Sequence, residues 1–211
     1  VIATHLSKII NEHAPELLGR EETQQLIDHA GRESPKLVED LVPKLLPLAT
    51  VQKVLQNLLE ERVHVRDMRT ILETLAEHAP RTQDAETLGE AVRGRLGRAI
   101  IHEIFGGAQE LQVMALEPGL EHILVQALGT PGESGVGMEP GLAERLVGDT
   151  VQAVDKQTQA GLPAVLLVPP VIRIVLSRFL RRSAPILRVI SHTEVPDGKS
   201  IRVTRMIGQM A

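Results

Sequence analysis

VQKVLQNLLEERVHVRDMRTILETLAEHA, residues 51–79, is the stretch that decides the fold of the first half of this chain. Apolar residues recur in it at helical spacing twice, first within 51–59 and again within 68–75. The charged segment 61–67 between them breaks the phase of the pattern. The stretch therefore predicts two helices joined by a tight connection, with their apolar stripes facing each other. It contains no catalytic signature, so it indicates a structural or docking role.

The sequence on either side of this stretch predicts more helices. A helical pattern fills residues 1–18, and a second helix follows over 20–30, with acids in its first turn and glycine after it. Ser34-Pro35 is a typical start signal for a short helix to Leu41. Asp84 is expected to cap a helix that runs to about residue 104 and ends before Gly106-Gly107. Residues 1 to about 107 are thus predicted to be all-helical.

After this glycine pair the period changes. Short apolar or alternating runs predict strands, and polar-faced periodic runs opened by proline predict helices between them. The predicted strands are 110–116, 164–168, 187–191 and 201–206, and the predicted helices are 118–128, 139–160 and 169–182. We therefore predict an α+β protein of more than one domain. An all-helical N-terminal half is followed, from the boundary at Gly106-Gly107, by a small α/β domain with a mixed sheet of about four strands.

Composition excludes several classes of protein. Hydrophobic residues make up 43% and charged residues 24% of the 211 residues, which is typical of a globular chain. Aromatic residues are 1%, so a stacking platform for single-stranded nucleic acid is not expected, and the net charge of −4 gives no pull toward nucleic acid. Cysteine is absent, so disulfides and cysteine-based zinc sites are excluded. No apolar run reaches the roughly 18 residues of a membrane span, and the start at Val1 suggests a fragment.

The motifs that could carry chemistry fail on their spacing. The glycine-rich loop 129–137 lacks the Lys-Ser/Thr pair of a phosphate loop, so a plain connection is predicted. No two of the eight histidines stand three to five residues apart, as a helical zinc pair requires. No serine lies in a Gly-x-Ser-x-Gly elbow. We expect no catalytic residues, no metal site, no cofactor and no enzyme activity.

One basic patch stands out in the last part of the chain. Arg178, Arg181 and Arg182 share one face of the helix predicted over 169–182, so an acidic partner could bind there. The other interpretation is a solvated helix end whose positive charges complement the helix dipole. The sequence leaves both open.

Several stretches together resemble one family, the FHIPEP family of large export-gate proteins in type III secretion, over essentially the whole chain. The quoted stretch belongs to the set, and so does the pattern around Glu139-Pro140, which is more similar to the flagellar branch than to the virulence branch. The other stretches are VIATHL (1–6), PKLVEDLVP (35–43), VR with LGRAI (92–100) and LSRFLRR (176–182).

The resemblance implies a membrane protein of the bacterial inner membrane whose cytoplasmic region forms a homo-nonameric ring. That region would be a docking platform for export chaperones with their cargo and for components of the export ATPase complex. The membrane would be reached only through an N-terminal region missing from this chain. Residues 1–18 would close a truncated first subdomain, 19–107 would form a helical subdomain, and 108–211 an α/β subdomain.

The resemblance also suggests site residues. Of the family's chaperone groove, only a wall with Val1 and Thr4 would be retained, so we expect this chain alone to bind chaperone–cargo complexes weakly or not at all. The charged edge of the quoted stretch would contact the neighbouring ring subunit through Arg62, Arg66, Asp67 and Arg69. The alternative from another class is a small α/β enzyme or nucleotide-binding domain in the second half. An acid and a proline, Glu117-Pro118, after the first strand disfavour a phosphate site there.

Overall fold

The computed structural model describes residues 13–128 and 138–208. Its internal contacts divide the chain into two compact units, one that ends at Leu96 and one that begins at Gly97. The sequence placed the change of architecture later, at Gly106-Gly107. The single helix predicted from Asp84 is in fact two, α6 (Ala85–Arg95) and α7 (Gly97–Phe105), and α7 belongs to the unit that contains the sheet.

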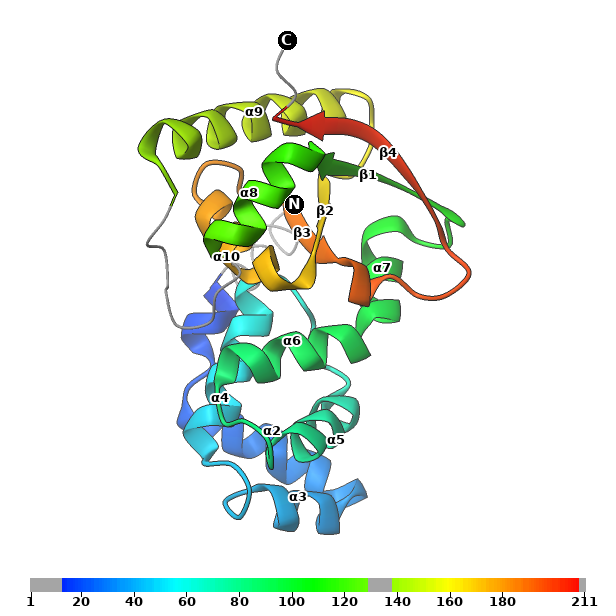
Figure 1. Ribbon diagram of the computed structural model, residues 1–211. Helices are drawn as coiled ribbons and strands as arrows, with labels where there is room; N and C mark the ends of the chain where they lie inside the picture. The colour runs from blue at the N-terminus through cyan, green and yellow to red at the C-terminus, as the bar shows by residue number, and fades with distance from the viewer. Residues whose placement is uncertain (1–12, 129–137, 209–211) are drawn as a thin grey trace. The chain divides into compact units, whose positions relative to one another are not determined.

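The first unit is helical, as predicted (Figure 1). The quoted stretch forms α4 (Leu48–Glu60) and α5 (Met68–His78), and their apolar stripes are buried. The stripes were expected to face each other, but the closest neighbour of each helix is α6. The unit is completed by α2 (Arg20–Glu33) and α3 (Pro35–Leu41). The stripes of α4 and α5 pack against α6 because α6 is itself amphipathic and places Leu88 and Val92, both fully buried, in the core.

Caps fix where these helices begin. Asp84 caps α6 as predicted, because its carboxylate accepts the backbone N–H of Thr87 at 2.8 Å. Asp67 does the same for α5, where its Oδ1 accepts the N–H of Thr70 at 3.1 Å. Ser34 stands at the N-cap of α3 with Pro35 as the first helical residue, but its side chain makes no capping hydrogen bond.

The second unit is built on a four-stranded sheet of β1 (Glu110–Leu116), β2 (Val165–Val168), β3 (Arg188–Ser191) and β4 (Ser200–Ile207). The strand order is β3-β2-β1-β4, and every pairing is parallel. The prediction of a mixed sheet was therefore wrong. A short connection between strands usually makes an antiparallel pair, but the segment 192–199 joins strands at opposite edges of the sheet. It begins with a 3₁₀ turn, η1 (His192–Glu194).

Helices cover one face of this sheet. They are α8 (Pro118–Leu128), α9 (Pro140–Gln159) and α10 (Pro170–Arg181), which Figure 1 shows on the same side of the strands. Alternate strand residues, such as Met114 and Leu116 of β1, join the helices in one apolar core. The intervening residues Leu111 and Val113 point to the other face and are also fully buried. Burial of both faces is typical of a parallel sheet.

Candidate interaction surfaces

The predicted ring-contact edge lies on the connection between α4 and α5 and on the first turn of α5. Its four residues are all exposed: Arg62, Arg66, Asp67 and Arg69. Arg62 follows the end of α4 with a positive φ of 59°, which turns the chain out of the helix. The structure therefore brings the four predicted residues together in one exposed segment.

Asp67 and Arg69 of this set make contacts within α5. Asp67 caps α5, as described above. Arg69 Nε lies 2.9 Å from Glu73 Oε1, one helical turn further along, and both side chains are more than half exposed. The hydrogen bond to Glu73 raises the pKa of the Arg69 guanidinium, so this side chain stays charged at any pH at which the protein is folded. An exposed pair of this kind contributes little to stability, because water and salt screen the attraction.

The second predicted patch lies on α10 and its C-cap. Arg178 and Arg182 are exposed and Arg181 is half-buried. Beside them lies a feature that the sequence analysis did not single out, a line of apolar residues formed by Val171, Val175 and Phe179, of which Val175 packs against the core. Val171 is 56% exposed and Phe179 is 37% exposed. The spacing of i, i+4 and i+8 on a helix with its core face elsewhere was the signal that could have identified it.

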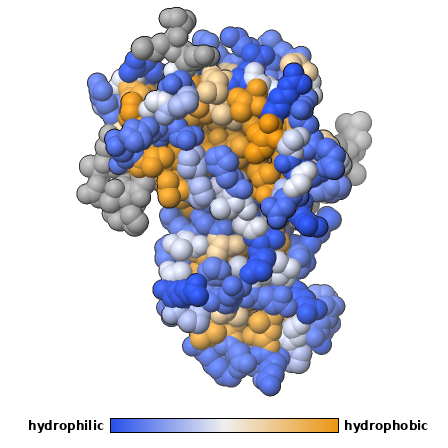
Figure 2. Space-filling view, turned by 45° about the vertical axis from the view of Figure 1, so that its right-hand side comes forward, coloured by the Kyte–Doolittle hydropathy of each residue, from blue (hydrophilic) through white to orange (hydrophobic). Residues whose placement is uncertain are grey.

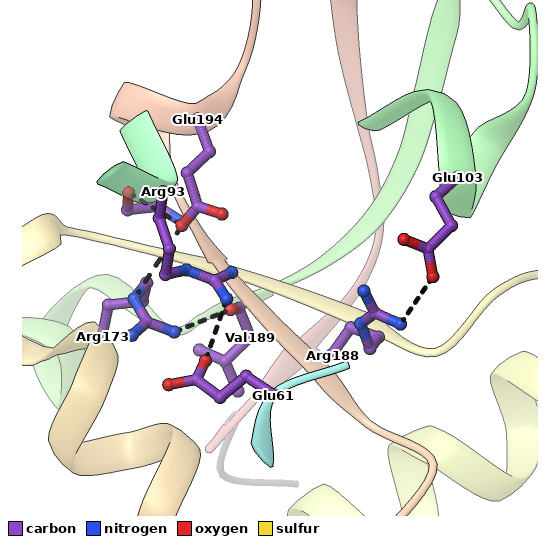
Figure 3. Close-up of polar contacts among 8 residues, drawn as sticks. Glu61, Arg93, Glu103, Arg173, Arg188, Val189 and Glu194 are labelled. Carbon is purple, nitrogen blue, oxygen red and sulfur yellow. Dashed lines mark hydrogen bonds and ion pairs between the residues drawn. The ribbon is translucent and has the colours of Figure 1, made fainter. Parts of the chain in front are cut away.

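Arg173, on the same helix, is not part of this surface. It is fully buried, with its Nε 3.8 Å from Glu194 Oε1 and its Nη1 donating to the carbonyl oxygen of Val189 at 3.3 Å (Figure 3). The Glu194 carboxylate in turn accepts the backbone N–H of Ser191 at 3.0 Å. The network ties α10 to the end of β3 and to η1. Arg173 therefore adds no charge to the surface of α10.

Two further ion pairs are shown in Figure 3, one in each unit. In the helical unit, Arg93 Nη1 lies 3.2 Å from Glu61 Oε2, and both side chains are largely buried. In the other unit, Arg188 Nη1 lies 3.5 Å from Glu103 Oε1, where the side chains are partly exposed. Because these cations are already balanced by nearby carboxylates, they add little to the charge that a partner would meet.

Apolar residues also reach the surface along the edge strand β4. Ile201, Val203 and Met206 are each between 36% and 47% exposed. Figure 2, which brings the side with β4 forward, shows apolar residues interrupting the charged surface of the sheet-containing unit. The pairing of β4 with β1 shifts register near Val113 and Met114. Such an irregularity twists an edge and discourages pairing with another strand.

One open cleft of about 410 Å³ lies in the sheet-containing unit, between α7 and the segment before β4. Arg98, His102 and Lys199 line it together with Asp197. Lys199 Nζ is held by the carbonyl oxygen of Ala108 at 2.6 Å, which fixes the amine at the rim.

The remaining predictions concern absences and the N-terminal groove. Val1 and Thr4 lie outside the described residues, as does the glycine-rich loop 129–137. Within residues 13–128 and 138–208, no three histidine or acidic side chains gather closely enough to hold a metal ion. In the same ranges, no helix has the length and hydropathy that crossing a membrane requires. The described residues offer charged and partly exposed apolar surface on helices, which is the kind of surface that protein-interaction domains use.

Comparison with known proteins agrees with this class. The model of the FHIPEP family matches residues 1–200, and the chain belongs to that family. It is 53% identical over 208 residues to the flagellar biosynthesis protein FlhA of Escherichia coli K12. That match covers 99% of the chain but 30% of the relative, so the chain spans about a third of the length of the curated relatives it matches.

Solved structures share the fold. The chain is similar to the nonameric SctV-C of EPEC, solved by cryo-EM, with a TM-score of 0.86 and 29% identity, over 98% of the chain and 62% of that protein. It is also similar to Chlamydia pneumoniae CdsV in its complex with CdsO, with a TM-score of 0.82 and 27% identity, over 98% of the chain and 61% of that protein. The resemblance found in the sequence is thus confirmed.

Proposed function

We propose that this chain is a docking and ring-assembly part of the bacterial flagellar protein export apparatus. In the intact protein it would lie at the cytoplasmic face of the inner membrane and bind export chaperone–cargo complexes and components of the ATPase complex. The observation that carries the proposal is the 53% identity to a flagellar biosynthesis protein over nearly the whole chain. The nonameric assembly of SctV-C and the complex of CdsV with CdsO support ring formation and partner binding in proteins of this fold.

Within this proposal, the edge with Arg62, Arg66, Asp67 and Arg69 contacts the neighbouring subunit. It is exposed, and its carrier helix α5 is fixed by its cap and by its buried face. A rim of exposed charge selects the partner and its orientation more than it adds affinity. Reversing two of the positive charges is therefore expected to impair assembly without unfolding the helical unit.

A chimaera tests the proposal. The matching 208-residue segment of Escherichia coli FlhA is replaced by this chain, and the chimaera is expressed in cells that lack FlhA. We expect restored motility and secretion of flagellar subunits. The double variant Arg66→Glu/Arg69→Glu should reduce both at an unchanged protein level. Two charge reversals elsewhere in the helical unit, Arg20→Glu/Lys53→Glu, are the matched control and should leave motility intact.

The outcomes separate the parts of the proposal. A chimaera that accumulates at the normal level but restores neither motility nor secretion contradicts the export function. A functional chimaera in which both double variants behave alike contradicts the assignment of the ring contact. Chaperone binding by the chain alone stays predicted to be weak, because only Val1 and Thr4 of the groove are retained. Titration of the chain with a flagellar export chaperone measures it, and micromolar affinity would refute that expectation.

A further inference from the structure

The open cleft beside α7 is lined by side chains that donate hydrogen bonds. Arg98 and His102 stand at i and i+4 of α7, so they share one face of the helix. Lys199 lines the cleft from the segment before β4. Within residues 13–128 and 138–208, the side chains of Arg98 and His102 make no hydrogen bond and no ion pair. Both are exposed, so their donors are available to a ligand.

Lys199 adds a charge that the protein positions but does not neutralise. Its Nζ donates to the carbonyl oxygen of Ala108 at 2.6 Å and to Oε1 of Gln109 at 3.0 Å. Both acceptors are uncharged, and an ammonium group has three donors. One N–H and the positive charge therefore remain for a ligand. Because the side chain is already held in place, it loses little conformational entropy when an anion binds.

The other lining residues set the size and polarity of the ligand. Ile101 and Pro196 give part of the wall an apolar surface. Gly106 and Gly107 follow the end of α7, and no atom lies within 4 Å of a Cβ added at either, so the cleft is open there to the main chain. The volume of about 410 Å³ is in the lower part of the range of small-ligand sites, about 300–1,000 Å³. The cleft therefore suits a short chain end or a small organic acid.

The charges of the lining select the kind of anion. With histidine taken as neutral, Arg98 and Lys199 carry two positive charges and Asp197 one negative charge, so the lining has one net positive charge. A carboxylate balances this charge, whereas a phosphate group would bring up to two negative charges toward Asp197.

We propose that the cleft binds a carboxylate at the carboxyl end of a peptide. The Arg98 guanidinium and the Lys199 ammonium would be its charged partners, and His102 would donate a further hydrogen bond. The last side chain of the peptide would contact the apolar part of the wall. A glutamate side chain or a free organic acid offers the same carboxylate, so the test has to distinguish these carriers from a chain end.

This inference does not depend on the proposed export function, because the cleft lies within the sheet-containing unit and its binding requires neither a ring nor a chaperone. The probe is an N-acetylated peptide of four residues, with tryptophan first and leucine last. One form has a free carboxyl end, a second has an amidated end, and a third is amidated but carries a glutamate before the leucine. The chain has no tryptophan and no tyrosine, so the fluorescence anisotropy of the peptide reports binding without background.

We expect the whole 211-residue chain to bind the free-acid peptide about tenfold or more tightly than the amidated one at low salt. The glutamate form should fall between them, and the differences should shrink as salt is raised. Arg98→Gln/His102→Gln should remove the preference. The matched control is His122→Gln/Arg145→Gln, which changes two exposed residues of α8 and α9 and should keep it. Gly107→Leu should weaken the free-acid peptide by narrowing the cleft, and circular dichroism establishes that each variant is folded.

Several results would overturn the inference. Equal affinity for the free-acid and amidated peptides, or no binding, removes the carboxylate as ligand. A preference that survives Arg98→Gln/His102→Gln places the binding elsewhere, and a preference lost equally in the control pair reduces it to the net charge of the chain. Stronger competition by inorganic phosphate than by acetate would assign the cleft to a dianion. A glutamate form that binds as tightly as the free acid, or acetate that does so, would refute the chain end as carrier.

Discussion

Gly97, the first residue of α7, is packed so closely that no side chain fits there. A Cβ added at this position would lie 2.3 Å from the carbonyl oxygen of Glu194 and 2.9 Å from its carbonyl carbon. The neighbour is backbone, so it cannot rotate away as a long side chain could. We predict that Gly97→Ala destabilises the sheet-containing unit although alanine is the better helix former.

The magnitude follows from the geometry. A carbon and a carbonyl oxygen come into contact at about 3.3 Å, so η1 or α7 would have to move by about 1 Å. The segment η1 resists this movement because Glu194 is anchored from its side chain, which accepts the N–H of Ser191 and pairs with Arg173. Overpacking of this kind costs about 1–3 kcal/mol. The expected change in the free energy of unfolding is a loss of that size.

Gly148→Ala is the matched control, since it adds the same methyl group to the same unit. Gly148 lies in the middle of α9, is exposed, and has no atom within 4 Å of an added Cβ. Alanine there should stabilise by about 1 kcal/mol through helix propensity. The two substitutions should therefore differ by about 2–4 kcal/mol with opposite signs.

The assay is urea unfolding followed by far-UV circular dichroism, because the chain lacks the tryptophan and tyrosine that fluorescence needs. If the two units unfold in separate transitions, only the transition of the sheet-containing unit should shift. A Gly97→Ala variant as stable as the Gly148→Ala variant would refute the reasoning, because it would mean that α7 and η1 are not in close contact.

Two further predictions concern polar groups. Arg173→Met should lower the free energy of unfolding by about 3–5 kcal/mol, because it leaves the buried Glu194 carboxylate without its cation; Arg173→Met/Glu194→Gln should be less destabilised, and equal urea midpoints for wild type and Arg173→Met would contradict the pairing. Hydrogen bonds from the backbone of Gly119 and Leu120 lower the pKa of Glu117, so its contribution is present above the ordinary pKa of a glutamate and is lost as the pH falls through the lowered value. Glu117→Gln should therefore melt below wild type at neutral pH, with a gap that closes in acid; a gap constant with pH would argue against the hydrogen bonds.

The positions of the strands could be predicted from the sequence nearly to the residue. β1 was predicted over its observed bounds, because an alternating run is followed by a proline that starts the next helix. The pairing of the strands could not be predicted, since it depends on contacts between distant segments. The segment 192–199 is short, yet the chain crosses to the far edge of the sheet and β4 pairs with β1. The position of a strand follows from the local sequence pattern, whereas the order of the strands in the sheet does not.

For the candidate surfaces, too, some features could be predicted from the sequence and others could not. The exposure of Arg178 and Arg182 follows from helical period alone, and so would that of Phe179. The period also places Arg173 with Leu176 and Leu180 on the core face of α10, so its burial had a signal in the sequence. Its partner had none, because Glu194 lies in another element and reaches Arg173 only through the course of the chain after β3.

The buried pair bears on how α10 is held in the sheet-containing unit. A buried ion pair is weak evidence for stability, but it has strict geometric requirements, and here it joins the core side of α10 to the end of β3 and to η1. The helix is thereby held both by its apolar packing and by the buried ion pair, so a shift of α10 along the sheet would break the pair as well as the core contacts.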